Sequence, residues 1–88
     1  MGDAEARIQA CQSALEAHCV ERRLVLSGDL RVSEEDAAKL LGIAHGHLKN
    51  MRQEGKGPAS YARGMNGCRL SYRLLDLALW IEAGRQDW

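Results

Sequence analysis

A chain of 88 residues forms one small domain that buries about 60–65% of its unfolded surface, so a large enclosed active site is not expected. Three cysteines without CxxC spacing exclude a disulfide framework, and no apolar run approaches the roughly 18 residues of a membrane span. The formal net charge of zero argues, taken alone, against a nucleic-acid binder. We expect a cytoplasmic protein, because Asp3 and Glu5 stand where a signal peptide would be basic and then apolar.

The first expected element is an amphipathic helix over residues 4–23. Strong helix formers carry an apolar stripe with spacings of three, four and four residues, formed by Ile8, Cys11, Leu15 and Cys19. This stripe has to pack against another element. Residues 24–26 form either a short extended segment or the end of the helix, and the pattern favours neither; they run into a turn at residues 27–29, Ser-Gly-Asp. No linker or repeat follows, so residues 1–88 are expected to form one domain around a core of residues 32–83.

A second helix is expected to begin after Ser33. Asp36 follows three residues later, as in a capping box, and Glu34 and Glu35 suit the positive end of a helix. Gly42 supplies the turn that ends this helix. Its apolar side consists of Ala37, Leu40 and Leu41.

A third helix, from about His45 to Glu54, follows with only a short link. Its buried face is predicted from residues spaced by four and three, which are Ala44, Leu48 and Met51. The opposite, outer face is polar and cationic, and consists of Gly46, Lys49, Asn50 and Gln53. The segment 55–58, Gly-Lys-Gly-Pro, stops the helix.

The remaining third of the chain predicts a hairpin and a closing helix. Residues 59–63 and 68–72 can pair as two strands joined by 64–67, Gly-Met-Asn-Gly. Residues 73–83 then form a helix that ends at Gly84, with an apolar stripe of Leu74, Leu77, Ala78 and Ile81. The expected fold is mainly α with a small β-hairpin: a helix-turn-helix and wing preceded by an extra N-terminal helix.

The neutral total charge hides a strong asymmetry along the chain. Residues 1–44 carry five basic and eight acidic side chains, and residues 74–88 carry a net charge of −2. Residues 45–73 carry six basic side chains against Glu54 alone, a net charge of +5. The positive charge therefore coincides with the third helix and the hairpin.

Residues 32–82 resemble the winged helix-turn-helix of the excisionase and MerR-type superfamily, which includes small phage and mobile-element excisionases. The motifs that carry the resemblance are SEEDAAKLLGI, HLKNMRQEGKGP and YRLLDLALWIE. Two features depart from the family pattern: Met51 stands where the recognition helix often has an aromatic residue, and the wing tip is GMNGC rather than Arg-rich. The second departure weakens the expectation of strong wing contacts.

The resemblance implies binding to double-stranded DNA, with the third helix in the major groove and the wing at nearby phosphates. Lys49 and Asn50 are the candidates for reading bases, since Asn pairs with adenine and Lys donates to guanine. His45 and His47 either donate hydrogen bonds or pack. The candidates for phosphate contacts are Arg52, Lys56, Arg63 and Arg69, and Gln53 and Asn66 complete the predicted DNA-binding set.

Two functions fit this resemblance. An excisionase, or recombination directionality factor, bends DNA beside the attachment site of a tyrosine-type integrase, whereas a small transcriptional regulator occupies a promoter. The short chain, without a ligand-binding domain or long coiled coil, favours the excisionase. About five phosphate contacts would give modest affinity that falls steeply with salt, so self-association on repeated sites is expected.

The competing class is a protein-interaction module that uses the stripe of residues 8–19 to bind a partner rather than DNA. Catalysis is not expected, because no general base with a defined partner is visible. A metal site at Cys11, His18 and Cys19 is not expected either, since the two thiols lie two helical turns apart. No cofactor is predicted.

Overall fold

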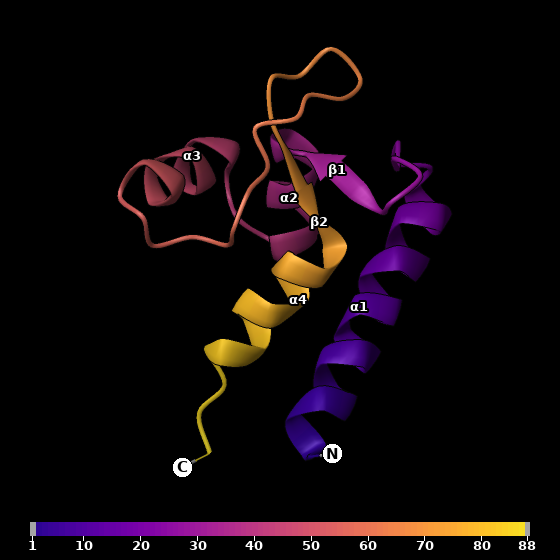
Figure 1. The fold of residues 1–88 in the computed structure, drawn as a ribbon, viewed down its shortest axis with the longest axis vertical. Coiled ribbons are helices and arrows are strands. Elements are labelled where there is room, and N and C mark those ends of the chain that lie inside the picture. Colours follow the sequence, from indigo (N-terminus) through magenta and orange to yellow (C-terminus); the bar gives the residue numbers. More distant parts are fainter. Residues whose placement is uncertain (1, 88) are drawn as a thin grey trace.

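Four helices and one two-stranded antiparallel sheet make up residues 2–87, which are the residues that the computed structural model describes (Figure 1). In chain order the elements are α1 (Asp3–Arg22), β1 (Arg31–Ser33), α2 (Glu34–Leu41), α3 (His45–Gln53), β2 (Ser71–Arg73) and α4 (Leu74–Ala83). The expectation of a mainly helical protein with a small antiparallel element is confirmed. The four helices begin and end within a residue or so of the predicted positions.

Helix α1 packs along α4, and the two lie side by side at the end of the molecule opposite the 61–71 segment (Figure 1). Its apolar stripe faces the core: Leu15 and Cys19 are buried, and Ile8 and Cys11 pack at the margin. An ion pair of 3.3 Å between Arg7 Nε and Glu82 Oε1 adds a second link. The stripe predicted from sequence is thus used within the molecule. Residues 24–26 belong to no helix or strand, so the helix does not continue through them.

Between α1 and β1 the chain makes a tight turn, and one carbonyl of this turn binds the first residue of α4. The Ser27 hydroxyl accepts a hydrogen bond from the Arg31 backbone N–H at 2.8 Å and donates one to Asp29 at 2.6 Å. Leu30 adopts a left-handed conformation (φ 64°), and its carbonyl accepts the Leu74 N–H at 2.9 Å. This bond satisfies one of the free N–H groups at the start of α4. The sequence predicted a turn at residues 27–29 but not the strand after it.

The sheet pairs β1 with β2 in antiparallel register, with Val32 opposite Tyr72 and Ser33 opposite Ser71. A continuous ladder between residues 59–63 and 68–72 does not form, so the predicted hairpin is only partly correct. Residues 61–71 instead form a loop, called the 61–71 loop below, with isolated bridges at Tyr61–Ser71 and Met65–Cys68.

Two features describe the tip of the loop. Asn66 and Gly67 adopt left-handed conformations, with φ of 49° and 80°, and form the tight turn between the bridged residues Met65 and Cys68. Gly64 passes so close to the Cys68 carbonyl oxygen that a Cβ at this position would overlap it. The regular antiparallel pairing of β2 is with β1 and not with residues 59–63.

The start and end of α2 follow the sequence signals. The Ser33 hydroxyl accepts the Asp36 N–H at 3.1 Å, as the predicted cap requires. Gly42 ends the helix in a left-handed conformation (φ 75°), where a side chain would be strained. Helix α3 begins three residues later, at His45.

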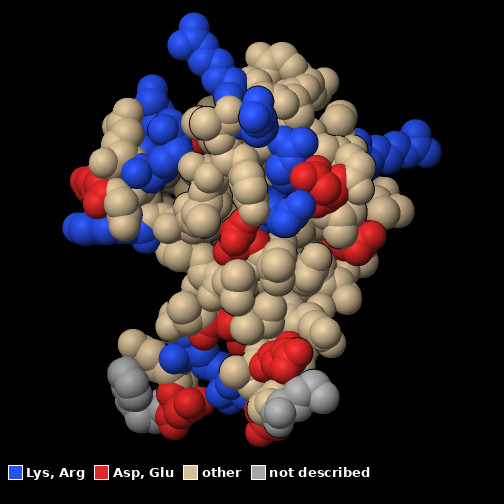
Figure 2. Space-filling view, viewed as in Figure 1, with Lys and Arg blue, Asp and Glu red and all other residues tan. Residues whose placement is uncertain are grey.

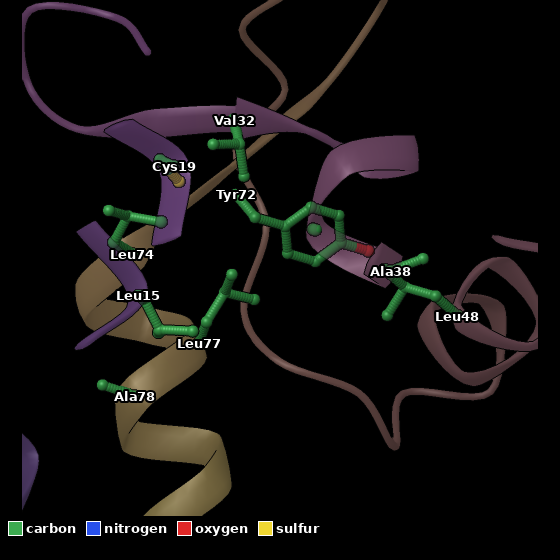
Figure 3. Packing of buried hydrophobic residues seen from close by; sticks show 10 residues of the cluster. Leu15, Cys19, Val32, Ala38, Leu48, Tyr72, Leu74, Leu77 and Ala78 are labelled. Atoms are coloured by element: carbon green, nitrogen blue, oxygen red, sulfur yellow. The ribbon is translucent and has the colours of Figure 1, made fainter. Parts of the chain in front are cut away.

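The core lies where the sheet, α1, α2, α3 and α4 meet (Figure 3). Tyr72 extends its ring from β2 toward Ala38 of α2 and Leu48 of α3 (Figure 3). Leu48 is fully buried and is the buried residue of α3; removing such a side chain from water contributes about 1.5–3 kcal/mol. Ala44 is exposed rather than buried, so the predicted inner face of α3 is narrower than the spacing indicated. No helix within residues 2–87 combines the length and apolar character needed to cross a bilayer.

Candidate nucleic-acid interface

The outer face of α3, which consists of Gly46, Lys49, Asn50 and Gln53, is exposed along its whole length. These four residues recur at three and four positions, so they share one side of the helix. Neither Lys49 nor Asn50 makes a side-chain hydrogen bond or ion pair within the described part of the chain. Both side chains are therefore free to bind another molecule.

The cationic side chains of residues 45–73 gather over α3 and the 61–71 loop (Figure 2). Arg63, Asn66 and Arg69 lie exposed on the loop. Among residues 2–87, the Arg63 and Arg69 side chains have no acidic partner within ion-pair distance. Lys56, just beyond α3, faces only the exposed Glu54 at 3.8 Å, a contact that is worth little in water.

A hollow of about 300 Å³ separates α3 from the 61–71 loop and reaches the first turn of α2. Lys49 lines it from α3, and Arg69 and Cys68 line it from the loop. His45, Arg52 and Glu34 also border it. The hollow thus brings together predicted site residues that lie about 20 positions apart in the sequence.

Glu34 is only 8% exposed, and its carboxylate accepts hydrogen bonds from three side chains. Arg52 donates from Nε to Oε2 at 2.7 Å and from Nη2 to Oε1 at 3.5 Å. The Tyr72 hydroxyl donates to Oε2 at 2.8 Å, and His45 Nε2 lies 3.2 Å from Oε1. A buried carboxylate is tolerated only when it is paired in this way.

The electrostatics of this cluster keep Glu34 charged and Tyr72 neutral. Burial works to raise the pKa of Glu34, but the hydrogen bonds from Arg52, Tyr72 and His45 outweigh it and leave the pKa below its ordinary value. Burial, together with the hydrogen bond to Glu34, raises the pKa of Tyr72. The hydrogen bond to Glu34 raises the pKa of Arg52.

A second polar cluster fixes the base of the 61–71 loop. Arg31 donates from Nη1 to the buried Ser71 hydroxyl at 2.8 Å, and Ser71 donates to the Arg63 carbonyl at 2.7 Å. Asp29 accepts from Arg31 Nε at 2.8 Å and from Arg73 Nη2 at 3.2 Å. The hydrogen bonds from Ser27 and Arg31 hold the pKa of Asp29 well below its usual range.

The C-terminal exit of α3 is tied to α4. The Lys56 N–H bonds back to the Met51 carbonyl at 2.8 Å, and Trp80 Nε1 donates to the Lys56 carbonyl at 3.1 Å. Pro58, two residues later, is buried. Helix α3 is thus fixed at its end by α4 and along its side by Leu48 and Glu34.

The predicted site residues fall into two groups. Nine of them are exposed: His45, His47, Lys49, Asn50, Gln53, Lys56, Arg63, Asn66 and Arg69. Arg52 instead turns inward to Glu34, so its expected role as a free phosphate contact is not supported by its position. His45 combines both situations, because it is half exposed and also faces Glu34.

Sequence reasoning assigned Glu34 only to the positive end of α2 and did not connect Tyr72 or Arg31 with the site. Glu34 is 18 positions from Arg52 and 38 from Tyr72, a separation that helical periodicity does not report. The one available signal was a Glu directly after the capping Ser33, where the strand ends and the helix begins.

Other chemistry finds less support. Burial raises the pKa of Cys11 and Cys19, which weakens both as nucleophiles. Within residues 2–87, no group of three His, Cys, Asp or Glu side chains lies close enough to hold a metal ion. The stripe that carried the protein-interaction hypothesis is covered by the rest of the fold. Comparison with protein-family models, curated proteins and solved structures gave no match.

Proposed function

We propose that this protein binds double-stranded DNA as a winged helix-turn-helix, with α2 and α3 as the two helices and the 61–71 loop as the wing. The observation that carries the proposal is the outer face of α3, where Lys49 and Asn50 are exposed and have no internal partner. A helix of this width fits the major groove of B-DNA. The cationic loop beside it supplies charge for flanking phosphates.

Side-chain chemistry determines which residues read bases and which contact phosphates. Asn50 offers the paired donor and acceptor that match the edge of adenine, and Lys49 offers donors for guanine O6 and N7. Arg63 and Arg69 on the loop, and Lys56 beyond α3, contact phosphates and set the register without reading sequence. Arg52 contributes indirectly, by holding Glu34.

Within this class, the protein acts as an excisionase or recombination directionality factor that binds and bends DNA near the attachment site of a tyrosine-type integrase. The resemblance of residues 32–82 to small excisionases supports this role. In such a role the protein performs no chemistry of its own; it positions DNA for the recombinase. Modest affinity per protomer makes cooperative binding to repeated sites the natural arrangement.

Electrophoretic mobility shifts on random duplexes and on the DNA flanking the gene test the class. Wild-type protein shifts both at low salt and prefers a sequence in the flanking DNA. Asn50→Ala lowers that preference by about 1–3 kcal/mol, whereas Arg69→Ala weakens binding to all duplexes alike. Gln9→Ala on the exposed side of α1 is the matched amide control and changes neither.

Two outcomes would contradict the proposal: no shift on any duplex at low salt, or equal behaviour of the Asn50→Ala and Gln9→Ala variants. The excisionase role is tested separately by an integrase reaction on paired attachment sites, in which adding the protein raises excision over integration. Binding at a promoter with no effect on that reaction would instead indicate a transcriptional regulator.

A further inference from the structure

Glu34 stands where four elements of the fold come together. β1 ends at Ser33, α2 begins at Glu34, and the sheet register places Tyr72 of β2 across from Val32. The Glu34 carboxylate is hydrogen-bonded to Arg52 and His45 of α3 and to the hydroxyl of Tyr72 of β2. One side chain therefore joins the DNA-facing helix to the strand that continues from the 61–71 loop.

Helix α3 has few other contacts that fix its orientation. Of its nine residues, only Leu48 is buried, and Met51 packs at the margin of the core one turn away. Two apolar side chains in one line restrain the rotation of a helix less than a broad buried face does. Charge-assisted hydrogen bonds at 2.7 and 2.8 Å are short and directional, so they restrict that freedom. The link from Trp80 to the Lys56 carbonyl lies beyond the last turn of α3 and restrains its end only.

We propose that Glu34 is a positioning residue for DNA binding: its carboxylate holds α3 in a fixed orientation to the 61–71 loop, so that Lys49 and Arg69 contact the same duplex. The inference rests on the proposed function. Lys49 and Arg69 line the two sides of one hollow, and Glu34 borders the same hollow. The separation between the two cations therefore depends on the cluster around Glu34.

If Glu34 acted only through its charge, removing that charge would strengthen DNA binding, whereas the positioning role predicts weaker binding. The direction of the change in affinity therefore tests the proposal. Removing a negative charge beside a DNA-binding surface strengthens binding to a polyanion. Glu35, one residue along and also bordering the hollow, is exposed and 3.8 Å from Lys39, so it serves as the matched control. Glu35→Gln should bind DNA as tightly as wild type or more tightly. Glu34→Gln makes the same change of charge and should bind more weakly.

The first experiment compares Glu34→Gln, Tyr72→Phe and Glu35→Gln in duplex binding at fixed salt, with folding checked by circular dichroism. Glu34→Gln and Tyr72→Phe should each lose about tenfold in affinity, a size typical of residues within one hydrogen-bonded network. Tyr72→Phe keeps the ring and the net charge, so it isolates the hydroxyl. Equal or tighter binding by both variants would overturn the proposal.

The second experiment needs no DNA. Amide hydrogen exchange of the free protein should be faster in α3 and at the Tyr61–Ser71 bridge in both variants, and unchanged at Leu15 in the packed part of α1. Faster exchange everywhere would indicate a general loss of stability, and unchanged exchange in α3 would also overturn the positioning role. If wild-type protein binds no duplex, the proposed function fails, and exchange still decides whether Glu34 ties α3 to β2.

Discussion

Salt dependence of DNA binding can be worked out from the ion pairs. Of the six basic side chains in residues 45–73, Arg52 is paired with Glu34 and Arg73 with Asp29. Lys49 is assigned to a base edge, so three remain for phosphates: Lys56, Arg63 and Arg69. Three contacts give a slope of log affinity against log salt of about −2.7, or about a 40-fold loss between roughly 50 and 200 mM salt. The number of phosphate contacts is thus lower than the roughly five that the sequence indicated.

Fluorescence anisotropy of a labelled duplex, titrated at several salt concentrations, measures this slope. Arg69→Ala should change it to about −1.8, because one counterion fewer is released. Arg22→Ala removes an equally exposed charge from the end of α1, away from α3 (Figure 1), and should leave the slope unchanged. Equal slopes for the two variants would refute the assignment of the binding surface, and a wild-type slope of about −4.5 would show that Arg52 and Arg73 also reach phosphates.

Three further predictions concern stability and the loop. Ser33→Ala should lower the free energy of unfolding in urea by about 1 kcal/mol through loss of the cap on α2, with the exposed Ser60→Ala as a neutral control. Because the pKa of Glu34 is lowered in the folded state, its charged carboxylate stabilises the fold at pH values above the unfolded pKa near 4.5, and this stability is lost as the pH falls. The melting temperature of wild type should therefore fall more steeply than that of Glu34→Gln between about pH 6 and about pH 3. Parallel curves for the two proteins would contradict this. Gly64→Ala should displace the 61–71 loop and reduce DNA affinity as much as Arg69→Ala does, and wild-type affinity would show that the loop makes no contact.

The helices were predictable because their signals are local. Ser33 and Gly42 mark the two ends of α2 within a few residues, and the stripe of α1 repeats every three or four positions. The exposed outer face of α3 followed from the same periodicity. For these elements, the residues that determine the structure lie within one or two helical turns of each other.

The sheet and the buried cluster depend on pairings that no local pattern reports. β1 has three residues, too few for a visible alternation, and its partner Tyr72 lies 40 positions away. Residues 59–63 looked like the natural partner of 68–72 because a Gly-rich turn joins them, yet β1 takes most of the pairing. Arg52 was misread for the same reason, since its charge is visible in the sequence but Glu34, which neutralises it, is distant.

The separation of charge on the molecule has a consequence for the proposed binding to DNA. Residues 45–73 carry a net charge of +5, and their cations gather over α3 and the 61–71 loop, whereas the rest of the chain has a net charge of −5 (Figure 2). The protein is thus a dipole with no net monopole. A polyanion exerts little long-range pull on such a particle but a substantial torque. Under the proposed function, the protein would rotate toward its binding orientation during encounter, and this alignment would act only within about 10 Å at 0.1 M salt.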